Sequence, residues 1–205
     1  MIEFVIGTGL AASAGLNAWM PLFLLGLADR LLPAVHLPSG WAWLSGDLAL
    51  WIIGALLAVE IVADKIPALD SLNDIIQSIV RPAAGGIAFG AGTGAQTVAV
   101  DDPASFFSDN AWVPVVAGIA ISLAVHVVKA TARVAANATT AGLAAPVLST
   151  AEDGASFALA VSAILVPAIA ALLLLGLVAA AVVLLHRRRL RRRTRADEAR
   201  GRTEV

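Results

Sequence analysis

The chain has 205 residues, of which 59% are hydrophobic and only 14% are charged. Soluble domains are usually about 45–50% apolar and about 25% charged, so this composition excludes an ordinary soluble domain and a disordered chain and indicates an integral membrane protein. The chain contains no Cys, which excludes disulfides, thiolate metal sites and cysteine nucleophiles.

Five apolar segments are candidate membrane spans, because a crossing helix needs about 20 mostly apolar residues. They are residues 4–28, 48–63, 83–100, 112–136 and 155–185, the last with Pro167 inside it. The second and third are short, so we expect them to be tilted or only partly immersed. The first is too long for the core of a signal peptide and is predicted to be a retained span. The polar segment 101–110 is predicted to be a loop.

A further helix is predicted between the second and third spans. After Pro67, polar residues recur at helical spacing among apolar ones, which is typical of an amphipathic helix; they are Asp70, Asn73, Asp74, Gln77 and Arg81. We expect Pro82 to end this helix. Residues 66–80 either form a surface helix or enter the membrane as a half-span, so the sequence predicts an all-α transmembrane bundle of five or six spans.

Charge divides the chain into a helical domain, residues 1–186, and an Arg-rich tail, residues 187–205. The tail carries nine Arg against three acids (9 − 3 = +6), whereas the preceding part carries five basic residues against twelve acids (5 − 12 = −7). An Arg cluster directly after an apolar run predicts a cytoplasmic tail that binds anionic membrane lipid; no nucleic-acid partner is needed to explain it. With five spans, however, Lys65 and Arg81 would then lie on the outer side, against the positive-inside rule.

A weak internal repeat is present. Residues 57–62 resemble residues 123–128, and each segment is followed by a lysine (Lys65, Lys129) and later by a proline (Pro82, Pro146). The pattern is compatible with an initial helix followed by two related helix–break–helix units, an arrangement that many transporters use. Chance similarity between apolar segments is the alternative.

Ionisable residues within the predicted spans form the candidate site, because a charge at the centre of a membrane helix costs roughly 2.5–3.5 kcal/mol. His126, Lys129, Arg133 and Asn137 fall on one helical stripe, and Glu60 and Asp64 share another face. We expect these acidic and basic sets to face each other inside the bundle. The candidate polar site consists of Glu60, Asp64, Asp70, Asp74, Arg81, His126, Lys129, Arg133, Asn137, Thr139, Thr140 and Glu152.

Structural interpretations of the same residues remain open. The charges can form a salt-bridge network that only fixes helix register, and Glu152 can belong to the first turn of a helix capped by Ser149 or Thr150. Thr139 and Thr140 can instead coordinate an ion at a broken helix. Asn17 and Pro21 mark a similar weak point in the first span.

These motifs resemble a family of bacterial membrane proteins known as domain of unknown function 4126. The resemblance covers residues 5–185 and is carried by Gly15 to Pro21, Glu60-Ile61, Ile66-Pro67-x-x-Asp70-x-x-x-Asp74, Lys129-Ala130-Thr131, Ala138-Thr139-Thr140-Ala141-Gly142-Leu143-x-x-Pro146 and Glu152. The chain departs from the family at Asp64-Lys65, where relatives also have apolar or aromatic residues. The resemblance implies a multi-pass protein of the bacterial inner membrane with no assigned activity.

Two functions are compatible with the sequence. It contains no Gly-x-Ser-x-Gly elbow, His-Glu-x-x-His helix, phosphate loop or dinucleotide fingerprint, so we expect neither an enzyme nor a cofactor or metal. The first function is a small permease or channel-like module that moves a small solute, an ion or a lipid headgroup past the polar site. The second is a non-catalytic membrane scaffold that organises a partner. Homo-oligomerisation is left open.

Overall fold

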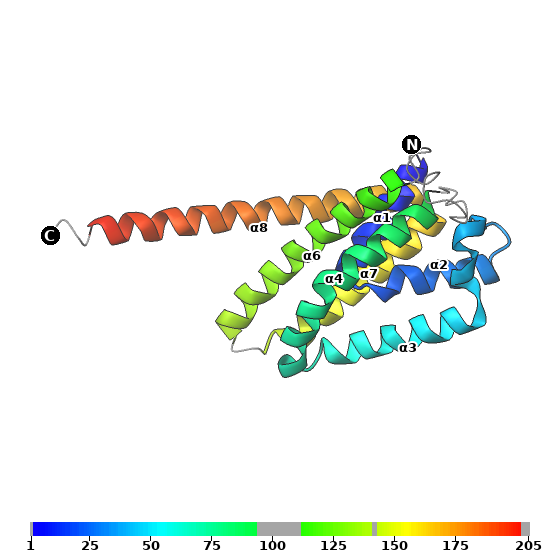
Figure 1. Ribbon diagram of the computed structural model, residues 1–205. Coiled ribbons are helices and arrows are strands. Elements are labelled where there is room, and N and C mark those ends of the chain that lie inside the picture. The colour runs from blue at the N-terminus through cyan, green and yellow to red at the C-terminus, as the bar shows by residue number, and fades with distance from the viewer. Residues whose placement is uncertain (1, 94–111, 141–142, 202–205) are drawn as a thin grey trace.

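The computed structural model describes residues 2–93, 112–140 and 143–201. Within these segments, only the backbone is described for residues 67–72, 74, 184–185 and 188–201. Its helices are shown in Figure 1. In chain order they are α1 (Ile2–Leu16), α2 (Trp19–Leu31), the 3-10 helix η1 (Ser39–Ser45), α3 (Asp47–Ala63), α4 (Pro67–Gly92), α6 (Trp112–Thr140), α7 (Ala145–Leu165) and α8 (Pro167–Gly201).

The described residues contain helices and no strand, so the predicted all-α fold is confirmed. By length and composition, α6 and α7 are able to cross a membrane, and η1 with α3 forms a third crossing if the two are one span bent by 63°. Helix α1 and residues Pro167–Val183 of α8 are apolar but shorter. These apolar helices indicate membrane association and account for two or three spans, fewer than the five or six predicted.

The segment predicted as the first span is two helices rather than one. Helix α1 ends at Leu16, and α2 begins at Trp19 and returns in the opposite direction (Figure 1). The Asn17 side chain accepts a hydrogen bond from the Met20 amide at 3.1 Å and thereby caps α2. Pro21 lies in the first turn of α2, where a missing amide donor leaves no helix bond unmade. The continuous apolar run concealed this break.

The bundle has two ends, which we call the N-terminal end and the tail end. At the N-terminal end, a Cβ on Gly7 would lie 3.1 Å from Phe89 Cγ near the end of α4, and one on Gly9 would lie 2.9 Å from Ala163 near the end of α7. The beginnings of α4 and α7 and the end of α6 lie at the tail end. The Arg-rich part of α8 leaves the bundle toward the same side (Figure 1).

Helices α1 and α2 therefore form a hairpin that enters the bundle from the N-terminal end and returns to it. Leu24 and Leu31 of α2, with Leu32 directly after it, line a crevice with Val161 and Leu165, at the end of α7. The tip of the hairpin, Asn17–Ala18, lies deep in the bundle, because Asn17 contacts Asp153 in the middle of α7.

Pro82 was predicted to end the amphipathic helix, but this prediction is wrong. Helix α4 continues through Pro82 to Gly92. A proline inside a helix removes one backbone hydrogen bond, here the one to the carbonyl of Ser78, and α4 packs closely on α6 next to this point, where a Cβ on Gly85 would lie 2.3 Å from Ser122 Cβ. The Ser122 hydroxyl of α6 donates a 2.7 Å hydrogen bond to the Arg81 carbonyl, next to the proline. The predicted amphipathic helix and the beginning of the predicted third span are thus one helix, and residues 94–100 of that span and the predicted loop 101–110 lie outside the described residues.

The segment predicted as the last span is also two helices. Helix α7 ends at Leu165, Val166 adopts a non-helical conformation (φ −143°, ψ 78°), and Pro167 begins α8. Proline suits the first position of a helix and cannot continue the preceding one. The two helices lie side by side in opposite directions, because Glu152 of α7 shares a cavity with Leu177 and Val178 of α8.

The structure gives no support to the internal repeat, because the matched residues hold different structural positions. Lys65 follows α3, whereas Lys129 lies inside α6. Pro82 lies inside α4, whereas Pro146 is in the first turn of α7. The repeat therefore remains a prediction without structural support.

Candidate intramembrane polar site

The site is built around the break between α1 and α2, where each helix end meets a side chain of opposite charge. The Ala18 amide, at the beginning of α2, donates a 3.1 Å hydrogen bond to Glu60 Oε2. The Leu16 carbonyl, at the end of α1, accepts a 2.7 Å hydrogen bond from Lys129 Nζ. A helix carries partial positive charge at its N-terminus and partial negative charge at its C-terminus. Both exposed backbone ends are therefore compensated inside the bundle.

Glu60 and Lys129 belong to a continuous network of ion pairs contributed by α3, α4, α6 and α7. The N–O distances are 2.9 Å for Arg81–Glu60, 3.6 Å for Arg81–Asp64, 3.4 Å for Lys129–Asp64, 3.2 Å for Arg133–Asp64, 3.2 Å for Lys129–Glu152 and 2.5 Å for Arg133–Glu152. Three cations thus face three anions. Five of the six side chains are at most 2% exposed, and Glu152 is 14% exposed. We call these six residues the ion-pair network.

His126 extends the ion-pair network toward the middle of α4. Its Nδ1 lies 3.1 Å from Arg81 Nη1 and its Nε2 lies 3.1 Å from Ser78 Oγ. Because a guanidinium donates and never accepts hydrogen bonds, Nδ1 is the acceptor in the first contact. The imidazole is therefore neutral with its proton on Nε2, which donates to the Ser78 hydroxyl. The histidine adds no charge to the network.

A second polar group joins the hairpin tip to the tail end. Asn17 Nδ2 donates to Asp153 Oδ1 at 3.0 Å, and Lys65 Nζ lies 3.2 Å from Asp153 Oδ2 and 3.0 Å from the Ile61 carbonyl. Ser13 and Ser156 bond to each other's hydroxyl and carbonyl across α1 and α7 at 2.8–3.0 Å. None of these five residues was in the predicted site. The signals for them in the sequence were the polar Asn17 inside an apolar run and the position of Lys65 against the positive-inside rule.

The other predicted residues have separate positions. Asn137 lies on α6 one turn beyond Arg133, and its Oδ1 is buried without a hydrogen-bond partner. Thr139 and Thr140 bond to carbonyls of their own helix, so the described structure does not join them to the ion-pair network. The side chains of Asp70 and Asp74, on the first part of α4, lie outside the described residues.

The interpretation of Glu152 as part of a helix start is wrong. Helix α7 begins at Ala145, seven residues earlier, because Pro146 occupies its first turn. Ser149 and Thr150 are consequently inside the helix, and the Thr150 hydroxyl donates to the Pro146 carbonyl at 2.8 Å. Glu152 instead turns toward Lys129 and Arg133 of α6.

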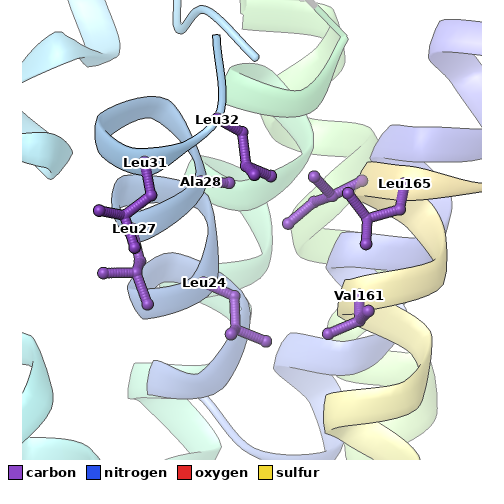
Figure 2. A pocket seen from close by; sticks show the side chains of 8 residues that line it. Leu24, Leu27, Ala28, Leu31, Leu32, Val161 and Leu165 are labelled. Carbon is purple, nitrogen blue, oxygen red and sulfur yellow. The ribbon is translucent and has the colours of Figure 1, made fainter. Parts of the chain in front are cut away.

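Two of the apolar cavities differ in their relation to the site. A crevice of about 180 Å³ lies between α2 and α7, and Figure 2 shows that leucine side chains line it from the α2 side, with Val161 and Leu165 opposite. A cavity of about 310 Å³ lies between α6 and α8, with Val125, Val128, Leu177 and Val178 in its walls and Lys129 and Glu152 at its edge. The first offers no polar contact; the second touches the ion-pair network.

The described carboxylates of the site have cationic partners. The described residues contain no group of three or more His, Cys, Asp or Glu side chains arranged to hold a metal ion. The carboxylates of Glu60, Asp64 and Glu152 are instead bonded to guanidinium and ammonium groups.

The comparison with protein families identifies the chain. The model of the family described as "Domain of unknown function (DUF4126)" matches residues 4–187. The chain belongs to this family. The match covers both the hairpin and the ion-pair network and ends where the Arg-rich tail begins. A search of the curated proteins and a search of the solved structures each gave no match.

Proposed function

We propose that this protein is a small permease or channel-like module of the bacterial inner membrane, which moves a small solute, an ion or a lipid headgroup past the ion-pair network. The observation that supports this most is the helix break. An interrupted helix whose two ends meet opposite charges is the arrangement with which many transporters form a site near the middle of the bilayer. Backbone that is not helical is tolerated at that depth only inside protein or beside water.

We propose a topology of five crossing helices, α3, α4, α6, α7 and α8, with the α1–α2 hairpin entering from one side only. Because the hairpin replaces the first predicted span and does not cross, Lys65 is no longer on the side opposite to the Arg-rich tail, and its conflict with the positive-inside rule is removed. Because the hairpin returns to the N-terminal end, Arg30 lies at that end, while Lys65 lies at the tail end with the Arg-rich tail. The positive-inside rule then places the tail end in the cytoplasm, where the arginines bind anionic lipid.

A purely structural ion-pair network is a poor alternative on energetic grounds. Removing charged groups from water costs several kcal/mol for each ion, and the attraction between them often only balances that cost. Apolar side chains would join α3, α4, α6 and α7 at least as firmly. The retention of six buried charges beside a helix break therefore favours a role in transport over one in catalysis or in stability alone.

Reconstituted vesicles provide the test. We expect the full-length protein in liposomes of anionic and zwitterionic lipid to increase the permeability to at least one probe among urea, acetamide, sodium, ammonium, chloride and phosphate. Glu60→Gln should reduce that flux at least tenfold, about 1.4 kcal/mol of barrier, while Arg30→Met, in an exposed pair outside the site, should leave it unchanged. Equal fluxes in protein-containing and empty liposomes for every probe would favour the scaffold function.

A further inference from the structure

Three buried polar atoms near the ion-pair network have no hydrogen-bond partner. They are Gln77 Oε1 on α4, Asn137 Oδ1 on α6 and Ser149 Oγ on α7. Gln77 is 4% exposed and Ser149 is fully buried. Folded proteins pair the great majority of such groups, so an unpaired one indicates a water or ligand site. Three of them on three neighbouring helices need a common explanation.

The three residues occupy matching positions. Gln77 lies four residues from Arg81, Asn137 four residues from Arg133 and Ser149 three residues from Glu152. At 100° per residue these spacings keep each residue within about 60° of its network neighbour on the helix surface. Helices α4 and α7 start at the tail end and α6 finishes there, so all three are displaced in the same direction. They form a polar layer on the tail side of the network, which we call the tail-side layer.

The charge balance of the ion-pair network defines what the tail-side layer accepts. Among the described side chains of the network, three cations and three anions neutralise one another, so an added ion would meet no free described counter-charge in a medium of low dielectric constant. The unpaired amide oxygens of Gln77 and Asn137 accept hydrogen bonds, and the Ser149 hydroxyl both donates and accepts them. An uncharged molecule that carries N–H or O–H donors satisfies all three groups.

We propose that the tail-side layer binds a small uncharged solute with amide or hydroxyl donors, held by Gln77, Asn137 and Ser149 beside the ion-pair network. This inference rests on the proposed transport function and names its class of substrate. The solute enters from the tail end, the side toward which the layer is displaced.

Binding to the purified full-length protein tests the proposal. Urea, acetamide and erythritol are the uncharged probes; ammonium chloride and sodium phosphate are the charged comparisons. At about 10 mM, a probe with a Kd near 1 mM raises the apparent Tm by about 4 °C. We expect such a rise with at least one uncharged probe and with neither salt. A rise with the salts alone, or with no compound, overturns the proposal.

Ser149→Ala separates a ligand contact from a structural role. The substitution removes a hydroxyl that has no partner, so the ligand-free protein should be as stable as the wild type or slightly more stable, while the probe-induced rise in Tm is lost. The matched control is Thr8→Val, which removes another buried, unpartnered hydroxyl, on α1 near the N-terminal end, and should leave the rise intact. A ligand-free protein destabilised by Ser149→Ala, or an equal loss of the rise in both variants, contradicts the assignment.

Flux measurements distinguish this inference from the proposed function. If a probe raises the Tm through Ser149 but does not cross the liposome membrane, the binding site is supported and the permease function is refuted. If the protein conducts a salt and Ser149→Ala leaves that flux unchanged, the permease function is supported and this site is refuted.

Discussion

The charge balance of the ion-pair network predicts strong coupling between two residues that do not touch. Glu60 and Lys129 lie on opposite sides of the helix break; the first accepts from the Ala18 amide and the second donates to the Leu16 carbonyl. Asp64 and Arg81 connect them through pairs of 2.9–3.6 Å. Neutralising one of the two leaves the network with a net charge, and neutralising both restores its balance.

The magnitudes follow from the burial of the groups. Removing one partner of a buried ion pair costs about 3–5 kcal/mol, because the other charge is left uncompensated. We expect Glu60→Gln and Lys129→Met each to destabilise the protein by about 3 kcal/mol. The double variant should be no less stable than the worse single variant, which requires a coupling energy of at least about 3 kcal/mol. Equilibrium unfolding in detergent, measured for all four proteins, gives the coupling directly.

An exposed pair serves as the control for this cycle. Arg30 and Asp47 form an ion pair whose side chains are 49% and 77% exposed. Arg30→Met and Asp47→Asn should each change the free energy of unfolding by less than about 1 kcal/mol and show little coupling. If the effects of Glu60→Gln and Lys129→Met add to within about 0.5 kcal/mol, the two charges do not share one network and the reasoning is refuted.

Three further predictions concern packing and topology. A Cβ at Gly15 would lie 2.6 Å from the Ser122 carbonyl oxygen, whereas one at Gly154 would meet nothing within 4 Å. Gly15→Ala should therefore lower the Tm, and Gly154→Ala should raise it by stabilising the helix by up to about 1 kcal/mol. Equal effects of the two substitutions would contradict the close approach of α1 and α6. Ser13→Ala should destabilise by about 0.5–1.5 kcal/mol, because it removes the hydroxyl that donates to the Ser156 carbonyl, whereas the Ser156 hydroxyl keeps its bond to the carbonyl of residue 13. Thr150→Ala, on the exposed face of α7, is its control in the same unfolding assay. Because the chain has no Cys, single cysteines can be labelled selectively: Ser39→Cys should react with an impermeant maleimide from the outside, and Thr139→Cys and His186→Cys only from the inside. Labelling of Ser39→Cys and Thr139→Cys from the same side would refute the topology.

The parts of the site that were predicted from the sequence are those with a local signal. A charged or amide residue in an apolar run is unusual enough to be noticed, and spacing alone put Lys129 and Arg133 on one face of a helix. The structure confirms that Glu60, Asp64, Arg81, Lys129, Arg133 and Glu152 lie together. Their pairing across α3, α4, α6 and α7 could be predicted because charged groups that are costly in hydrocarbon are expected to pair with one another.

The breaks inside the first and last predicted spans were missed because apolar runs do not show where a membrane helix reverses. Residues 4–28 and 155–185 are each continuous in hydropathy, yet each contains two antiparallel helices. Asn17, Pro21 and Pro167 mark the breaks, but Pro82 gives the same local signal and lies inside a continuous helix. Tertiary packing distinguishes these prolines: the Arg81 carbonyl beside Pro82 receives a hydrogen bond from Ser122, and the tip of the first hairpin is bonded to Glu60 and Lys129.

The long sequence separation of these bonds constrains how the protein assembles. The Ala18 amide depends on a carboxylate 42 residues away, and the Leu16 carbonyl depends on an ammonium group 113 residues away. In lipid, an unpaired backbone group costs several kcal/mol, so the α1–α2 hairpin is not stable at this depth until α3 and α6 are in place. The hairpin is therefore held by the same charges that form the site, and a change of their pairing would act first on the hairpin tip.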